Sequence, residues 1–404
     1  MRTRTGRIAL EALAAAVVAF LLSLIVLGPL LTHLDAAWSG GDMLSTYVNT
    51  AAWNGFGYET TTQFGFPLGM NLNYFPGIDI TENTFALVVN AVTGSTFLGL
   101  NILLVLSFPL VAALAYLTIR MTGLEGPLAI ALAVAFTFVP YHWGRALGHT
   151  YLATLYSAVV GVALLILISS GRFEHYLRSP SRRTRWLFIA TLAVMVIVIA
   201  WTGVYYAAFT LILGIATLAW RLGVHTRLRQ VALEAVPFAG IAVMAVIGFI
   251  PALLTLRADP PLASLGERLP YESVIFAGNL SMALLPLPMS HLPGADFYNR
   301  SVVEAVAAAP ALENTIITNF GTWVSTACLI VMVIGLFRRR GGLLPFIGYL
   351  TLVTVLFVIP WGRHWLIGTT DTPWDLDKAH PAASKADIDY ILGHVNTLLR
   401  DPLD

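Results

Sequence analysis

Five carboxylates fall within residues 32–96, a polar and aromatic stretch that follows the first hydrophobic block, and four of them are candidate site residues. These four are Asp35, Asp42, Asp79 and Glu82. A carboxylate in a partly dry site can hold a raised pKa and can take a proton from a hydroxyl group. These residue types in one stretch beside a membrane therefore predict acid–base chemistry.

A structural role competes with this interpretation. Aspartate is among the best N-cap residues, because its side chain accepts from the first free backbone N–H groups of a helix. Asp42 stands before an apolar pattern with helical spacing, and Asp79 and Thr81 stand before another. Capping therefore remains open for both aspartates.

A second group with chemical potential lies in the segment 140–149, which reads Pro-Tyr-His-Trp-Gly-Arg-Ala-Leu-Gly-His. Arg145 offers a permanent charge and a forked donor for phosphate oxygens, with His142 or His149 assisting. The alternative is an aromatic belt with an arginine that reaches the membrane surface. His142 and His149 lack an evident third ligand for a metal, so the metal requirement is left unknown.

The composition shows what must position these residues. The chain has 404 residues, of which 57% are hydrophobic and 11% are charged, whereas soluble proteins carry about 25% charged residues. The apolar residues form blocks long enough to cross a bilayer, which needs about 20 residues. Cys328 is the only cysteine, which excludes an internal disulfide and a cysteine metal site. We predict an all-α polytopic membrane protein.

We expect about nine transmembrane helices. Their predicted ranges are 8–31, 97–119, 126–141, 150–170, 186–200, 203–220, 231–255, 320–337 and 342–360. Most Lys and Arg residues then fall in short segments on the side of the amino terminus, which the positive-inside rule places in the cytoplasm. Glu11 and Glu234 lie inside spans near that side, where a side chain that reaches the surface explains them.

The predicted outer face consists of the loops 32–96 and 256–319 and a polar tail, 361–404, with an amphipathic helix. Within the first loop, the apolar spacing from Asp42 predicts a helix along the membrane surface. A second helical run begins near Thr81, and the Gly- and Pro-rich stretch 55–77 between them reads as loop. Residues 1–360 form the predicted transmembrane domain.

This arrangement resembles the GT-C class of membrane glycosyltransferases. The similarity lies in a first span, an acidic residue soon after it in Gly40-Gly41-Asp42, and a large first outer loop with two membrane-parallel helices. The resemblance implies a polyprenyl-phosphate-linked sugar as donor, Asp42 as the catalytic residue, and Asp79, Glu82 or Asp35 as a further acidic site. The loop contains no Asp-x-Asp or Glu-x-Asp pair, so a divalent metal cofactor is possible but not required.

These observations predict a glycosyltransferase in a bacterial plasma membrane. It would pass a sugar from the polyprenyl-phosphate donor to an envelope glycan, lipid or protein on the outer face, in contact with membrane lipid and without nucleic acid. Asp42 would activate the acceptor, and Arg145 would bind the donor phosphate. The alternatives are a polytopic transporter or lipid flippase, for which the sequence shows no internal repeat, and a membrane scaffold.

Overall fold

The computed structural model describes a helical assembly that covers most of the first 258 residues. The described residues are 4–38, 42–52, 60–61, 70–71, 73, 79–139, 141–142, 150–223, 226–258, 358–361 and 364–367. Arg145, His149, the loop 256–319 beyond Ala258 and the predicted spans 320–337 and 342–357 lie outside this part. The same holds for most of the tail 361–404.

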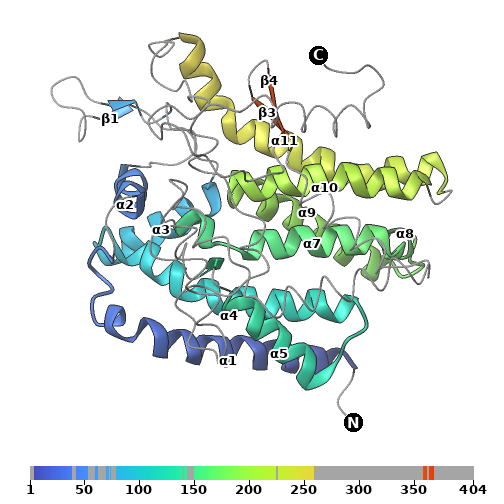
Figure 1. The fold of residues 1–404 in the computed structure, drawn as a ribbon, viewed down its shortest axis with the longest axis horizontal. Helices are drawn as coiled ribbons and strands as arrows, with labels where there is room; N and C mark the ends of the chain where they lie inside the picture. Colours follow the sequence, from blue (N-terminus) through green and yellow to red (C-terminus); the bar gives the residue numbers. More distant parts are fainter. Residues whose placement is uncertain are drawn as a thin grey trace, which may run out of the picture.

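Long apolar helices lie side by side across the described part (Figure 1). Six stretches are long and apolar enough to cross a membrane. Five are the single helices α1 (Arg4–Leu31), α4 (Leu98–Met121), α9 (Arg182–Trp201), α10 (Val204–Gly223) and α11 (Leu228–Ala258). The sixth joins a 3-10 turn, η2 (Thr150–Ala153), to α7 (Tyr156–Ser169). The prediction of an all-α membrane protein is confirmed at this level.

Two predicted spans need correction. The range 126–141 forms only a short helix, α5 (Gly126–Thr137), which ends because Phe138 leaves the helical backbone conformation. Twelve residues rise about 18 Å, less than a bilayer core of about 30 Å. The predicted span 342–360 ends in an extended segment, because Val358–Trp361 is strand β3, paired antiparallel with β4 (His364–Ile367).

Two hydrophobic cores join the helices. The first lies between α1, α4, α5 and α7, where small residues such as Ala15, Ala112 and Ala133 let the backbones approach closely. The second lies between α7, α9, α10 and α11, where the ring of Phe238 packs so close to Gly214 that a Cβ there would lie 2.5 Å from it. The outward faces of α9 and α11 keep large apolar side chains exposed, for example Val194 and Val236, as expected for contact with lipid.

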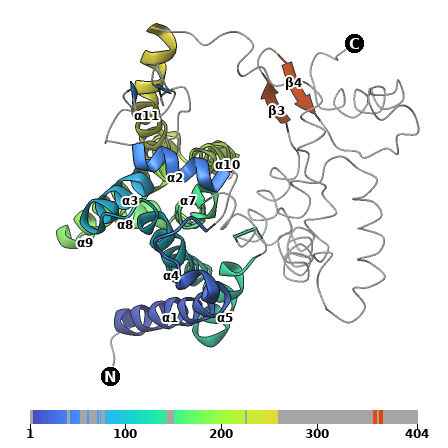
Figure 2. The same cartoon turned by 90° about the vertical axis from the view of Figure 1, so that its left-hand side faces the viewer.

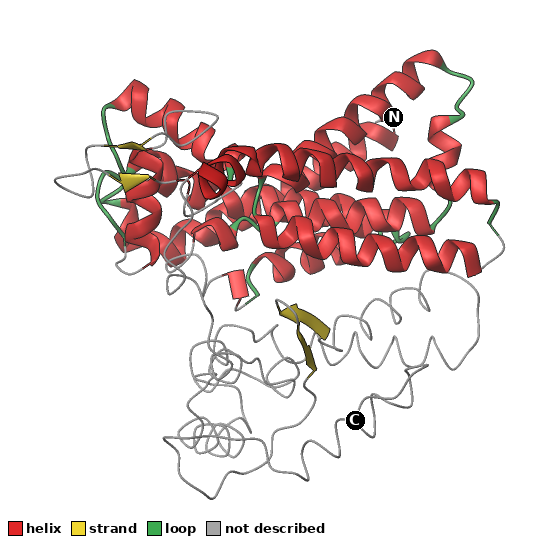
Figure 3. Cartoon of the chain, turned by 90° about the horizontal axis from the view of Figure 1, so that it is seen from above, coloured by secondary structure: helices red, strands yellow, loops and turns green. Residues whose placement is uncertain are grey.

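Two further helices lie at one end of the bundle, seen from two other directions in Figures 2 and 3. They are α2 (Asp42–Ala52) and α3 (Ile80–Thr93), and both fall where the sequence predicted helices in the first loop. The stretch between them contains a short antiparallel pair, β1 (Thr60–Thr61) with β2 (Met70–Asn71). Met43 and Tyr47 of α2 are buried against Ala86 of α3 and against α4.

Glycine fixes the join between α3 and α4. Gly94 ends α3 with a left-handed backbone, φ +74°, which L side chains rarely adopt. At the start of α4, Gly99 donates its N–H to Asn90 Oδ1 at 2.9 Å. A Cβ on Gly99 would lie 2.6 Å from the Cα of Ala86. This close approach holds α3 directly against α4.

The opposite end carries most of the described arginines, and we call it the arginine end. There α1, α9 and α11 begin, α4 and α10 end, and the short helix α8 (Arg172–Leu177) lies (Figure 1). We call the end with α2 and α3 the carboxylate end. Which side of a membrane each end faces stays a prediction.

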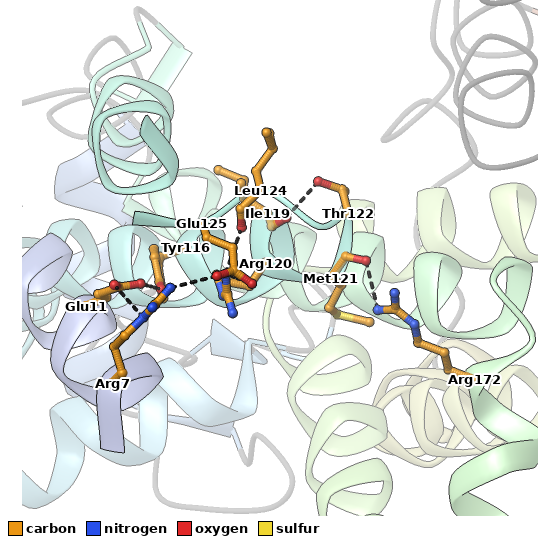
Figure 4. Close-up of polar contacts among 10 residues, drawn as sticks. All are labelled: Arg7, Glu11, Tyr116, Ile119, Arg120, Met121, Thr122, Leu124, Glu125 and Arg172. Atoms are coloured by element: carbon orange, nitrogen blue, oxygen red, sulfur yellow. Dashed lines mark hydrogen bonds and ion pairs between the residues drawn. The ribbon is translucent and has the colours of Figure 1, made fainter. Parts of the chain in front are cut away.

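Carboxylates at the arginine end are all paired in the described part of the chain. Arg7 contacts Glu11 at 3.2 Å and Glu125 at 2.7 Å, and Arg120 contacts Glu125 at 2.8 Å (Figure 4). Tyr116 donates to Glu11. These contacts tie the start of α1 to the turn between α4 and α5.

Glu234 shows the same pairing inside the protein. It is fully buried in α11, and the guanidinium of Arg221 donates to its two oxygens at 3.1 and 2.8 Å. A bidentate contact of this kind offsets much of the cost of burying the charge. The expectation that Glu234 reaches the membrane surface is therefore wrong, since it is fully buried against Arg221. Glu11 stays partly exposed at this end, beside Arg7.

Candidate functional site

The carboxylate end brings together two acidic residues predicted from the sequence. Asp79 immediately precedes α3 and Glu82 lies in its first turn. Asp79 is 8% exposed and Glu82 is fully buried. Both side chains are therefore shielded from solvent, although burial of an isolated charge is costly.

Asp79 stands at the N-cap position, but its side chain does not cap the helix. Its carboxylate instead lies near the backbone N–H of Gly203, in the turn between α9 and α10, and this N–H favours the charged form. Gly203 has φ +78°, and this left-handed conformation reverses the chain within two residues. The capping interpretation therefore fails for Asp79, which joins α3 to a turn far away in the sequence.

Glu82 has one good donor. Tyr156, the first residue of α7, donates its hydroxyl to Glu82 Oε1 at 2.9 Å. The other oxygen, Oε2, is buried and has no hydrogen-bond partner among the described residues. Thr154 lies beside Glu82, but its hydroxyl donates to the carbonyl of Tyr151 at 2.6 Å.

A fourth polar group, the hydroxyl of Thr202, completes this cluster. Thr202 is fully buried, lies next to Tyr156, and its Oγ1 makes no hydrogen bond of good geometry. Buried polar groups almost always have a partner, so each exception needs an explanation. We call Asp79, Glu82, Tyr156 and Thr202 the carboxylate site.

The environment favours the protonated form of both acids. Burial raises the pKa of Asp79 to about 7, against the stabilising N–H of Gly203. Burial also raises the pKa of Glu82 well above its usual value, and the nearby negative charge of Asp79 raises it further. Two acids that repel each other in a dry site tend to share one negative charge at most.

No ion pair in the described part reaches this site, because all of them lie at the arginine end. The same part contains no group of three or more His, Cys, Asp or Glu side chains that could hold a metal ion. The site therefore offers oxygen atoms and one or two exchangeable protons.

A neighbouring polar cluster links α2 to the site. Thr50 of α2 and Tyr151 of η2 both donate to Asn83 Oδ1, at 3.0 and 2.6 Å. Asn83 is the residue after Glu82, so the contacts position α3 from two sides. Tyr47 likewise donates to Asn101 at the start of α4, and burial raises the pKa of Tyr47 to about 12.

The other predicted site residues are not brought to this cluster. Asp35 is exposed in the turn after α1. Asp42 is the first residue of α2, and its role as catalytic residue stays a prediction. Arg145 and His149 lie outside the described residues, so their phosphate-binding role also stays a prediction.

His142 lies in the protein interior. Its Nδ1 lies 2.7 Å from the carbonyl of Thr137 and its Nε2 lies 3.1 Å from the hydroxyl of Ser107. The ring stacks on Phe108 with centroids 4.4 Å apart. Burial lowers the pKa of His142 to about 4. An uncharged ring with both nitrogens engaged helps to pack α4 against the 137–142 segment.

Sequence reasoning missed Tyr156, Thr202 and Gly203. Tyr156 looked like one apolar residue of a span, and only the placement of α7 against α3 gives its hydroxyl a role. The Thr202-Gly203 pair did carry a signal, since two spans separated by so few residues require a tight turn with glycine.

The comparisons with known proteins concern a short stretch. Over 50 residues, 12% of this chain, it is 74% identical to glycerol-3-phosphate dehydrogenase 2 of Mycobacterium tuberculosis (strain H37Rv) and of Mycobacterium bovis. It is 72% identical over 50 residues to glycerol-3-phosphate dehydrogenase of Mycobacterium leprae. The match spans about 8% of the length of those curated relatives. No family model and no solved structure matches the chain.

This finding corrects the predicted activity. The matching curated proteins are named as dehydrogenases, which contradicts the prediction of a glycosyltransferase. That prediction depended on the arrangement of a span and an acidic loop, and no sugar-specific motif supported it. The resemblance to the GT-C class, the polyprenyl-phosphate donor and the envelope acceptor stay predictions, since no comparison tests them.

Proposed function

We propose that the helical part of this protein is a membrane-embedded binding domain whose carboxylate site exchanges a proton for a small monovalent cation such as sodium. The observation that carries this proposal is the buried pair of Asp79 and Glu82, with Oε2 of Glu82 unpartnered. Small hard cations prefer oxygen ligands, and the side chains of the carboxylate site present only oxygens.

Charge balance favours a monovalent ion. With one proton shared between the two acids, the site carries one negative charge, which a single positive charge neutralises. The hydroxyl of Thr202 would add an uncharged oxygen ligand. Release of the cation would restore a proton to the pair, so occupation by the cation and by the proton would exclude each other.

The experiment measures proton release on addition of sodium chloride to purified protein in weakly buffered detergent at pH 7, with choline chloride as the salt control. Infrared spectroscopy follows the band of protonated carboxyl groups in parallel. Sodium is expected to release protons and to remove part of that band. Asp79→Asn is expected to abolish both signals, because Asp79 is the acid that ionises first, whereas Asp35→Asn, at an exposed position, leaves them intact. Equal responses to sodium and choline would overturn the proposal.

A second candidate function comes from the comparisons. The 74% identity over 50 residues supports a role in glycerol 3-phosphate dehydrogenation for the part of the chain that carries the matched stretch. The test incubates the purified chain with glycerol 3-phosphate and a two-electron redox dye. Dye reduction that requires glycerol 3-phosphate would support this candidate, and its absence with added flavin and nicotinamide cofactors would exclude it.

We also propose that the arginine end faces the cytoplasm of a bacterial plasma membrane. The positive-inside rule supports this orientation, because the described arginines apart from Arg257 lie at that end. Single cysteines introduced at Thr5 and Val92 in a Cys328→Ser background would be labelled in intact cells with an impermeant maleimide. Labelling at position 92 alone is expected, and labelling at position 5 alone would reverse the orientation.

A further inference from the structure

The arginine end also carries cations that have no counter-charge in the described structure. Arg172 of α8, Arg182, Arg183 and Arg185 of α9, and Arg227 and Arg229 at the start of α11 are all exposed. We call these six residues the arginine surface. Its neighbours Glu174 and Glu234 are already paired, with Arg178 and Arg221.

Packing holds these cations at one place. The helices α9 and α11 lie against each other along their length and begin at the same end. The helix α8 folds back onto α9, where Phe188 contacts Phe173 and stacks on Tyr176 with centroids 5.6 and 5.5 Å away. Arg172 is further fixed by donating to the carbonyl of Met121 at 2.8 Å (Figure 4).

The position of the charges is unfavourable without an anion. Three arginines occupy the first turn of α9, where the helix macrodipole already places positive partial charge, and no acidic residue accompanies them. The first turn of α11 likewise contains no acid beside Arg229. Like charges at two adjacent helix starts repel one another, so an anion bound there would stabilise the fold.

Apolar side chains surround the charges. Trp186 follows Arg185 directly and is 57% exposed, and Leu228 lies between Arg227 and Arg229 and is 73% exposed. A free anion uses only the guanidinium groups, whereas a phospholipid presents a phosphate next to an acyl chain. Tryptophan and arginine together are typical of the level of lipid headgroups.

We propose that the arginine surface binds the headgroups of anionic phospholipids. The guanidinium groups of α9 and α11 bind the phosphodiester oxygens, and Trp186 and Leu228 contact the adjoining acyl chains. The inference is independent of the carboxylate site at the other end. Inorganic phosphate would bind the arginines and leave Trp186 and Leu228 without a partner. Binding of a nucleic acid is the alternative that the experiment tests.

The experiment measures retention of phosphatidylglycerol and phosphatidylcholine by the full chain, purified in an uncharged detergent, with native mass spectrometry. Wild-type protein is expected to retain phosphatidylglycerol preferentially. Each arginine near an anionic membrane surface contributes about fivefold in affinity, so Arg182→Gln/Arg183→Gln/Arg185→Gln should lose on the order of a hundredfold. Arg257→Gln removes an exposed arginine at the other end and should bind as wild type.

Single variants Arg183→Gln and Arg229→Gln provide a second measurement if the triple variant does not fold, and each should lose about fivefold. Equal retention of the two lipids by wild type would overturn the proposal. So would unchanged binding by all arginine variants, or displacement of the lipid by an equal concentration of inorganic phosphate or of a short DNA duplex.

Discussion

The two ends of the helical assembly treat buried carboxylates in opposite ways. At the arginine end, Glu234 is fully buried and receives two hydrogen bonds from Arg221. At the carboxylate end, Glu82 is equally buried, has a tyrosine donor on one oxygen, and leaves the other unpartnered. The first arrangement balances the carboxylate with a guanidinium group, and in the second, burial favours the protonated form of Glu82.

The difference separates a structural role from a functional one. A fully paired carboxylate fixes α10 to α11 and has nothing left to offer a ligand. A carboxylate with an open oxygen and a raised pKa costs stability whenever it ionises. Groups with perturbed pKa values gather at functional sites, so this cost is the feature that directs attention to Asp79 and Glu82.

The largest expected effect concerns Asp79→Asn above neutral pH. The folded pKa of about 7 lies above the usual value of 3.8, so the folded state holds the extra proton between those values. The associated stability is complete below about pH 4 and is lost as the pH rises through 7. A shift of this size corresponds to on the order of 4 kcal/mol.

We therefore expect Asp79→Asn to be more stable than wild type by up to that amount at pH 8, and not at pH 4. Denaturant unfolding in sodium-free buffer measures it. The variant is compared with wild type at each pH because His142 also affects stability. Its pKa is lowered, so both proteins lose stability as the pH falls below 6.5, and the comparison cancels this effect. A matching gain in Asp35→Asn would show that the effect is not local to the buried pair.

Arg221→Gln tests the paired end. It leaves Glu234 buried without its cation, which costs about 3 to 5 kcal/mol in comparable sites. Thermal unfolding of the detergent-solubilised protein at pH 7 checks this value. The double variant Arg221→Gln/Glu234→Gln should recover most of the loss, because no uncompensated charge remains. If the double variant unfolds as early as the single variant, the pair is not what holds α10 to α11.

How well the sequence predicts a feature of this structure depends on whether local sequence or contacts between distant residues determine that feature. Hydropathy places α1, α4 and α9 to α11 within a few residues, because a bilayer requires about 20 apolar residues in each span. It fails for 126–141, where the helix stops at Thr137 because Phe138 leaves the helical backbone conformation. Asp79 and Glu82 could be selected from the sequence by residue type alone.

The partners of those acids could not be predicted. Tyr156 reaches Glu82 from α7, and Thr202, in the turn before α10, lies next to Tyr156. Only tertiary packing places them there. The N-cap interpretation of Asp79 follows from local sequence, but its side chain makes no cap hydrogen bond and lies near the N–H of Gly203 in a distant turn.

Tyr156→Phe tests the carboxylate end by removing the hydroxyl that donates to Glu82. Removal of the hydroxyl leaves Oε1 of Glu82 without its donor, and a buried group that loses its partner costs about 1 to 3 kcal/mol. Denaturant unfolding at pH 7 gives the loss. Tyr205→Phe serves as the control, because Tyr205 is 59% exposed on α10. Equal losses in the two variants would mean that the hydrogen bond to Glu82 contributes nothing specific.

The smallest effect is expected for Arg7→Gln, which breaks two ion pairs at the arginine end. Arg7 is 53% exposed and Glu125 is 44% exposed, and exposed pairs contribute about 0 to 1 kcal/mol because water and salt screen them. Arg120 also remains to hold Glu125. Thermal unfolding at low and at high salt measures the change, which should vanish at high salt. A loss as large as that of Arg221→Gln would show that burial does not decide the strength of a pair at this end, and that the network of α1, α4 and α5 acts as one unit.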